Sequence, residues 1–261
     1  MKRSAFFFPG LFLILLLTCS AISAKQATGS DEMRDRRGAT IRLRQPAKGK
    51  VVYLIFTADS MFEGGQYALD VLREHNVKAS FFLTGNFLRD SLSNGSVIHR
   101  MVNEGHYVGP HSDRHILLAD WDASRTILAD RDSALRDMRN NYVWLAKWGV
   151  DTTTARFIVP PFEWYHGDHI TAYRHAGYYP VNPSPGFITY RDYTTPDMEE
   201  YCPSDSIWAN FIDNLNHKDI DGNFIILHLG TQDSRTDKFY YRLGELIDSL
   251  KLHGYLPIRL L

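Results

Sequence analysis

Short apolar runs alternate with longer amphipathic segments over most of the chain. The run VVYLIF at 51–56 is apolar throughout, which is typical of a strand that is covered on both faces. Residues 65–75 instead place their apolar side chains at helical spacing, and this alternation continues to the end of the chain. The expected strands are 51–56, 79–83, 106–109, 157–159, 178–181, 224–229 and 256–258, and the expected helices are 65–75, 97–104, 124–148, 168–176 and 235–252.

Strands that alternate with helices over one domain-sized length predict a mainly parallel sheet with helices outside it. The number of strands favours an α/β fold of the (β/α) barrel type, complete or incomplete, over an open sheet. We therefore expect one domain at 51–261. In barrels of this kind the chemistry lies at the carboxyl ends of the strands and in the loops that follow them.

The first 50 residues have a different character. A basic start, an apolar run at 6–17 and small residues at 20–24 are the pattern of a signal peptide, here 1–24. The run is too short to span a bilayer comfortably. Cys19 lies in a sequence that also resembles a bacterial lipoprotein signal, so a lipid anchor there is the alternative to free release. Either pattern predicts export, and the charged stretch 25–50 predicts a flexible lead-in.

Composition excludes some classes of protein. The chain has 261 residues, 44% of them hydrophobic, and its 29 Lys and Arg against 30 Asp and Glu give a net charge of -1. This is enough apolar material for a large core, and it excludes a disordered chain. A charge near zero gives no general attraction to phosphate backbones, so we expect no nucleic-acid partner. Two cysteines, Cys19 and Cys202, cannot form a disulfide framework.

Polar side chains that could carry chemistry follow or end three predicted strands. Asp59 follows VVYLIF, His111 and His115 follow the strand at 106–109, and His228 lies within FIILHL. Four-residue spacing places two imidazoles on one side of a helical turn, close enough to share a cation. Two histidines, one acid and an open position are typical of catalytic zinc and non-haem metal sites. The alternatives are two solvated loop histidines and, at 228, a satisfied core histidine.

Five blocks in a fixed order then match one family. LIFTAD at 54–59 stands where that family has Thr-Phe-Asp-Asp, and HSDRH at 111–115 matches its His-Ser/Thr-x-x-His metal block. KASFF at 78–82 matches a following strand, VPPF at 159–162 stands for Arg-Pro-Pro-Tyr, and LH at 227–228 matches the final Leu-His. On these blocks the chain resembles the polysaccharide deacetylases, the nodulation-protein-B-like group also called carbohydrate esterase family four.

The resemblance implies metal-dependent removal of acetyl groups from N- or O-acetylated glycans on a distorted (β/α) barrel. It implies that His111 and His115 bind a divalent metal, usually zinc. Asp59 would be the acidic ligand if the loop after Phe56 is shifted by one residue. His228 would be the acid that protonates the leaving amine or alcohol.

The resemblance also suggests how substrate is held. Leu227 would help to form the pocket for the acetyl methyl group, and the backbone N–H of Phe162 would face the developing oxyanion. Phe162, Trp164 and Tyr165 form an aromatic loop that could stack on sugar rings, with core packing as the competing interpretation. The polar, turn-rich loop at 190–197 is a further candidate to line the same groove.

The departures from the family pattern concern the general base. The family has two adjacent acids in its first block, whereas this chain has Thr57 and Ala58 there, with a single acid at Asp59. The arginine that normally pairs with the base is Val159, and no aspartate partner is recognisable in 181–189. The loss of the base and the loss of the arginine have one physical explanation, because a buried arginine without its carboxylate would be an uncompensated charge.

Glu163 could supply the missing base. It follows Phe162 on the same strand-end loop, so Glu163 or Asp59 could accept a proton from water at the metal. The alternative for Glu163 is a solvated loop glutamate. Two other functions stay open: a non-catalytic glycan-binding member of the fold, and a hydrolase of another amide or ester on the same metal site.

Overall fold

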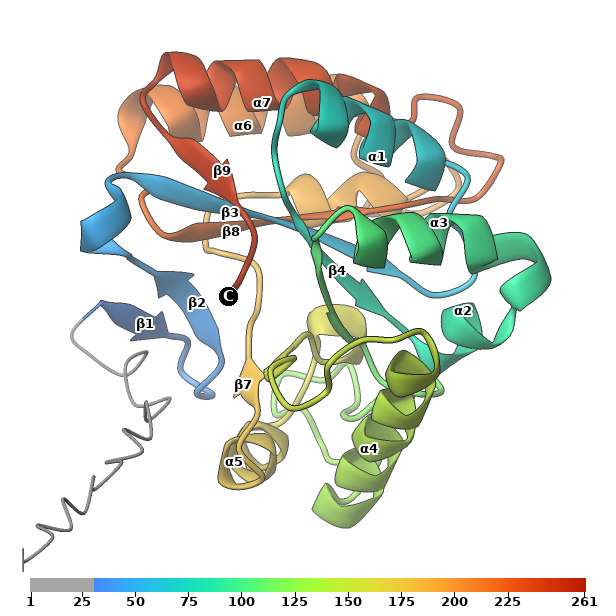
Figure 1. The fold of residues 1–261 in the computed structure, drawn as a ribbon. Coiled ribbons are helices and arrows are strands. Elements are labelled where there is room, and N and C mark those ends of the chain that lie inside the picture. Colours follow the sequence, from blue (N-terminus) through green and yellow to red (C-terminus); the bar gives the residue numbers. More distant parts are fainter. Residues whose placement is uncertain (1–30) are drawn as a thin grey trace, which may run out of the picture.

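In the computed structural model, which describes residues 31–261, the first predicted strand becomes the centre of a seven-stranded sheet (Figure 1). This strand, β3 (Val51–Ala58), pairs in parallel with β8 (Asn223–His228) on one side and β4 (Ser80–Leu83) on the other. β9 (Leu256–Ile258) lies beside the first half of β3, and β5 (Tyr107–Pro110) extends the sheet from β4. The mainly parallel arrangement follows the prediction.

The sheet curls and nearly closes through a second, two-stranded sheet. This sheet consists of β6 (Phe157–Ile158) and β7 (Tyr179–Pro180). On one side the N–H of Val159 donates to the carbonyl of Pro110 at the end of β5, over 3.3 Å. On the other side Val181 forms a bridge with Thr40. Single links of this kind close a distorted (β/α) barrel, which confirms the predicted fold class.

The helices cover the outside of the barrel. In Figure 1, α6 and α7 lie together at the top and α4 and α5 at the bottom. The α6 helix was not predicted, although Ile207, Phe211 and Leu215 place an apolar stripe against the core. The α-helices are α1 (Gly65–Glu74), α2 (Gly85–Arg89), α3 (Ser91–Asn103), α4 (Arg131–Lys147), α5 (Gly167–His175), α6 (Ser204–His217) and α7 (Leu243–Leu252). The short 3₁₀ turns are η1 (Pro46–Lys48), η2 (Pro161–Glu163), η3 (Thr189–Tyr193) and η4 (Phe239–Arg242).

The predicted helix 124–148 begins later than expected. Asp130 caps α4, because its carboxylate accepts the N–H of Ser133 over 2.6 Å. Before this cap, Ala119 and Ile127 form an antiparallel bridge. Residues 119–127 therefore form a small hairpin-like loop instead of a first helical turn.

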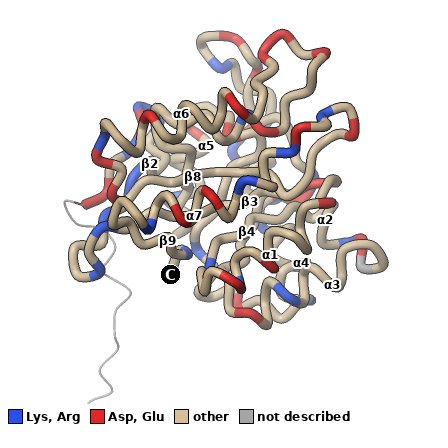
Figure 2. The backbone as a smooth tube through the Cα atoms, turned by 90° about the horizontal axis from the view of Figure 1, so that it is seen from above, with Lys and Arg blue, Asp and Glu red and all other residues tan. Residues whose placement is uncertain are grey.

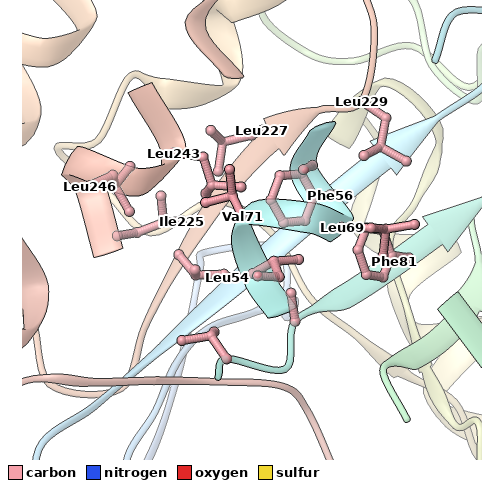
Figure 3. Packing of buried hydrophobic residues seen from close by; sticks show 14 of the residues in the cluster. Leu54, Phe56, Leu69, Val71, Phe81, Ile225, Leu227, Leu229, Leu243 and Leu246 are labelled. Atoms are coloured by element: carbon pink, nitrogen blue, oxygen red, sulfur yellow. The ribbon is translucent and has the colours of Figure 1, made fainter. Parts of the chain in front are cut away.

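Strand alternation decides which side chains of β8 reach the barrel interior. Ile225 and Leu227 pack against the helices, and Figure 3 shows Leu227 beside Leu243 of α7 and Val71 of α1. Residues two positions apart share a face of a strand, so His228 points the other way, into the barrel. Leu227 is fully buried in the core under the helices. The prediction that it lines a pocket for the acetyl methyl group is therefore wrong.

The stretch predicted as a flexible lead-in, 25–50, is ordered in the part that the structure describes. Residues 31–50 include β1 (Glu32–Arg34) and β2 (Thr40–Leu43), and β2 pairs with β8. Charged residues of this stretch have partners far away in sequence. Arg42 contacts Asp219 at 2.9 Å, and Glu32 contacts Arg174 at 2.8 Å. The predicted flexibility is therefore wrong for 31–50.

The predicted signal peptide and Cys19 lie outside the described residues. Between residues 31 and 261, no helix has both the length and the apolar character needed to cross a bilayer. Figure 2 shows acidic and basic residues interspersed over the helices and loops, in agreement with a net charge of -1. Cys202 is buried and has no disulfide partner among residues 31–261.

Candidate active site

The carboxyl ends of the strands open into one cavity of about 710 Å³. β3, β5 and β8 end there, as does the turn that follows β6. This is the position expected for chemistry in a barrel of this type. Five of the predicted polar residues line the cavity: Asp59, His111, His115, Glu163 and His228.

Two imidazoles meet in this cavity. Nδ1 of His111 lies 2.9 Å from the carbonyl of Val159 and donates to it, which leaves the Nε2 lone pair directed elsewhere. Nε2 of His111 and Nε2 of His115 are 3.3 Å apart. Two nitrogens bound to one tetrahedral zinc ion at about 2.0–2.1 Å would be separated by about 3.3–3.4 Å. The pair therefore has the spacing of two ligands of one ion.

Both histidines are kept neutral, as metal ligands must be. Burial, and then the neighbouring His115, hold the pKa of His111 well below its ordinary value. Burial also lowers the pKa of His115, against the opposing charge of Asp59. Neutral imidazoles present lone pairs to a cation, so the donor chemistry of the pair fits a divalent metal.

Helix α4 positions the loop that carries this pair. The carboxylate of Asp137 accepts the backbone N–H groups of Asp113 and Arg114, over 2.9 and 3.1 Å. The side-chain carbonyl of Asn141 accepts the N–H of His111 over 2.9 Å. Buried hydrogen bonds to backbone groups fix a loop, so the pair does not depend on solvent-exposed turns.

Gly85, at the start of α2, gives a test of how tightly this loop is packed. A Cβ atom at Gly85 would lie 1.9 Å from Oδ1 of Asp113 and 2.7 Å from its carbonyl oxygen. We expect Gly85→Ala to lower the free energy of unfolding by about 1–3 kcal/mol, the usual cost of overpacking, as measured by urea denaturation. Gly95→Ala in α3 is the matched control, because its nearest atom, in Trp148, would lie 3.4 Å away. An equal loss in both variants would contradict the packing argument.

Asp59 lies on the cavity wall but does not complete a three-ligand set. Its Oδ1 accepts the hydroxyl of Thr84 over 2.8 Å and the amide of Asn86 over 3.1 Å. Over residues 31–261, no three His, Cys, Asp or Glu side chains are grouped closely enough to hold a metal ion. The structure thus brings together two of the three predicted ligands and holds the third through other contacts.

Glu163 reaches the cavity as predicted. Phe162 and Glu163 both have positive φ, 59° and 51°, and this sharp turn after the Pro-Pro pair directs the carboxylate inward. Its Oε1 lies 3.9 Å from Nε2 of His111. That oxygen is buried and has no hydrogen-bond partner among the described residues. Burial raises the pKa of Glu163 to about 7, against an opposing effect of His228, so this is not a solvated loop glutamate.

The end of β3 carries no acid before Asp59. Thr57 and Ala58 line the cavity, and the buried hydroxyl of Thr57 finds no partner in the described part of the chain. Val159 is fully buried in the barrel interior. Asp59 is therefore the first acid after β3 on the cavity wall, and a valine occupies position 159.

His228 has a carboxylate partner that the sequence did not reveal. Oδ1 of Asp192 lies 2.6 Å from Nδ1 of His228, and Oδ2 accepts the backbone N–H of the same residue over 2.9 Å. Burial acts to lower the pKa of His228, but Asp192 and then Glu163 outweigh it, so the pKa is raised. Asp192 lies in η3, within the polar loop at 190–197 that was expected to line the groove. The sequence shows an acidic residue in this loop, but it does not show that this residue pairs with His228.

The predicted sugar-stacking loop divides into two parts. The side chains of Phe162 and Trp164 line the cavity, and the ring of Phe162 lies 4.2 Å from that of His115, centroid to centroid. Trp121, which is 57% exposed and was not predicted, lies 5.2 Å from Trp164.

Tyr165 does not line the cavity. It is fully buried in the core between α4 and α5, and its hydroxyl donates to Oδ2 of Asp35 over 2.7 Å. The prediction of a substrate-binding role for Tyr165 is wrong, because core packing and this hydrogen bond satisfy the whole side chain.

Comparisons with known proteins found one matching family model and several similar proteins. The family model described as polysaccharide deacetylase matches residues 44–181. A chitooligosaccharide deacetylase of Sinorhizobium fredii is 27% identical over 199 residues, which are 72% of this chain and 80% of the relative. Among solved structures, a peptidoglycan N-acetylglucosamine deacetylase matches with a TM-score of 0.62 at 23% identity. The match covers 80% of this chain and 86% of the chain of that deacetylase. A pseudoenzyme of carbohydrate esterase family 4 from Bacillus anthracis matches with a TM-score of 0.60 at 18% identity. This match covers 81% of the present chain and 64% of the pseudoenzyme chain.

Proposed function

Since the chain belongs to the polysaccharide deacetylase family, we propose that it is a metal-dependent hydrolase that removes acetyl groups from an N- or O-acetylated carbohydrate. One observation carries this proposal. Nε2 of His111 and Nε2 of His115 are 3.3 Å apart in a cavity that is also lined by Glu163 and by His228, whose Nδ1 is paired with Asp192. The cavity thus holds a donor pair for a cation, a carboxylate base and an acid.

The proposed metal is a divalent cation, with zinc favoured by the two imidazole donors. His111 and His115 would hold it, with Asp59 as the candidate acidic ligand. When bound, such a cation supplies a Lewis acid that activates water and polarises a carbonyl.

The remaining steps belong to residues of this chain. Glu163, as a carboxylate, takes a proton from the water whose oxygen attacks the acetyl carbon. The backbone N–H of Phe162 stays the candidate donor to the developing oxyanion. His228, as an imidazolium held through Nδ1 by Asp192, gives its Nε2 proton to the leaving nitrogen or oxygen as the bond to the acetyl carbon breaks. The products are acetate and a free amino or hydroxyl group.

A second candidate is a non-catalytic glycan-binding protein. The observation that favours it is the loss of the usual acids, since Thr57 and Ala58 occupy their place on the cavity wall. It differs from the first in one outcome, because it predicts glycan binding without release of acetate.

We also propose that the protein is exported. The basic, apolar and small-residue pattern of the first 24 residues supports this. Fusion of these residues to a reporter, followed by cell fractionation, is expected to place the reporter outside the cytoplasm. If the protein incorporates a radioactive fatty acid and loses this label when Cys19 is replaced, it carries a lipid anchor at Cys19.

The proposed reaction is tested by acetate release from acetylated chitin oligomers, peptidoglycan and acetylated xylan. We expect release from at least one of these, loss of activity with a chelator, and recovery on addition of zinc. His111→Ala is expected to lose both bound metal and activity, because one of two adjacent donors is gone. Binding of a glycan without acetate release would select the second candidate, and neither binding nor release would contradict both.

A further inference from the structure

Arg125 is the one arginine or lysine among the residues found to line the cavity in the described part of the chain. The two carboxylates on the lining, Asp59 and Glu163, belong to the proposed reaction centre. A cation at the cavity margin has no part in the chemistry proposed above. Its placement therefore calls for a separate explanation.

The structure holds this guanidinium in a fixed position. Its central carbon lies 3.4 Å from the ring centroid of Trp164, and one terminal nitrogen donates to the carbonyl of Tyr165 over 3.0 Å. The indole N–H of Trp164 in turn donates to the carbonyl of Asp120 over 2.9 Å, which ties the hairpin-like loop 119–127 to the cavity wall. A stacked guanidinium is pre-organised, so little side-chain entropy is lost when it binds an anion.

Between residues 31 and 261, no carboxylate lies within ion-pair distance of Arg125. Asp122, on the same loop, is engaged by the N–H and the hydroxyl of Thr126, and Asp120 by the N–H of Trp121. Burial and then Arg37 lower the pKa of the Arg125 guanidinium, against the opposing effects of Tyr165 and Asp35. Stacking covers one face but leaves N–H groups on its edge for a ligand.

An aromatic shelf, made of Phe162, Trp121 and Trp164, connects Arg125 to the reaction centre. Ring centroids are 4.2 Å apart between His115 and Phe162, 5.8 Å between Phe162 and Trp121, and 5.2 Å between Trp121 and Trp164. Arg125 stacks on the last ring of this shelf. It thus lies a subsite away from the histidine pair and not at the scissile bond.

We propose that Arg125 binds a carboxylate on a sugar next to the acetylated one, so that the preferred substrate is an acidic glycan. The inference rests on the proposed function, because it extends the same cavity. The shared chemistry is a carboxylate on a sugar, either a uronic acid or an ether-linked lactate. A planar guanidinium recognises such a group through two parallel hydrogen bonds.

Binding tests this proposal without depending on turnover. The probes are two acetylated oligosaccharides, one with a uronic acid and one with an ether-linked lactate, each compared with its own methyl ester. Quenching of the fluorescence of Trp121 and Trp164 reports binding. We expect at least one acid to bind about tenfold more tightly than its ester, since hydrogen bonds to charged groups are about twice as strong as neutral ones. In Arg125→Gln the ratio of acid to ester affinity should fall towards one.

Arg139→Gln is the matched control, because it removes the same charge from an exposed position on α4 that does not line the cavity. It should keep the preference of the wild type. Equal binding of acid and ester, a preference that survives Arg125→Gln, or no binding of any probe overturns the inference. Acetate release from the neutral glycans tests the proposed function separately, so the two can fail independently.

Discussion

Glu163→Gln is expected to lower kcat for acetate release by about 10²–10⁴-fold, the usual contribution of general acid–base catalysis. The amide keeps the shape of the side chain but cannot accept a proton from water. Nε2 of His111 lies 3.9 Å from Oε1 of Glu163, and the histidine pair does not depend on this carboxylate for its position. Metal content, measured by mass spectrometry of the purified protein, should therefore stay at the level of the wild type.

Stability separates a functional role of Glu163 from a structural one. Its Oε1 is buried without a hydrogen-bond partner in the described part of the protein, and burying an unpaired charge is costly. The glutamine variant should therefore melt at a temperature at least as high as the wild type. Glu199→Gln, at an exposed position, is the control and should change neither property. Undiminished turnover in Glu163→Gln would leave Asp59 as the base.

The barrel was predictable because its strands are short, buried and nearly continuous in apolar residues. Every predicted strand is present within one or two residues of its expected ends. The segment at β1 and β2 could not be predicted, since its charged residues have partners far along the chain, such as Arg42 with Asp219 and Glu32 with Arg174. Ion pairs between residues over a hundred positions apart leave no local pattern.

The site shows the same limit on a smaller scale. Residue types and strand ends were enough to place His111, His115 and Glu163 at one cavity. They were not enough to tell Trp164, which lines it, from Tyr165, which is buried. Which neighbour points inward depends on two positive φ angles in the preceding turn, and a β-strand pattern does not predict those.

The role of Asp192 could be recognised only from the three-dimensional structure, where it pairs with His228. Asp192→Asn is expected to lower kcat by about 10²-fold or more, because it disables the acid His228 and an acid catalyst contributes about 10²–10⁴-fold. Asparagine cannot supply both a charge and two acceptors to the N–H of Nδ1 and the backbone N–H of His228. The imidazole would lose the fixed tautomer that leaves Nε2 to carry the transferred proton. KM should change little, since Asp192 is buried and is not among the residues that line the cavity.

The pH profile distinguishes this role from a merely structural one. Asp192 is the main influence that raises the pKa of His228 against the effect of burial. In the proposed reaction His228 acts as the acid and must be protonated, so activity should be lost as the pH rises through this pKa. Removing the charge lowers the pKa, and the alkaline limb of the profile should move to lower pH. Asp233→Asn, at an exposed position, should leave the limb in place.

A double substitution completes the argument. Residues that act as one unit have effects that do not add. If Asp192 acts only through the imidazole, then His228→Gln removes whatever Asp192 contributes, and adding Asp192→Asn to it should lower kcat no further. A full additional loss in the double variant would mean that Asp192 stabilises the cavity by another route. His228 would then donate its proton without the help of a paired carboxylate.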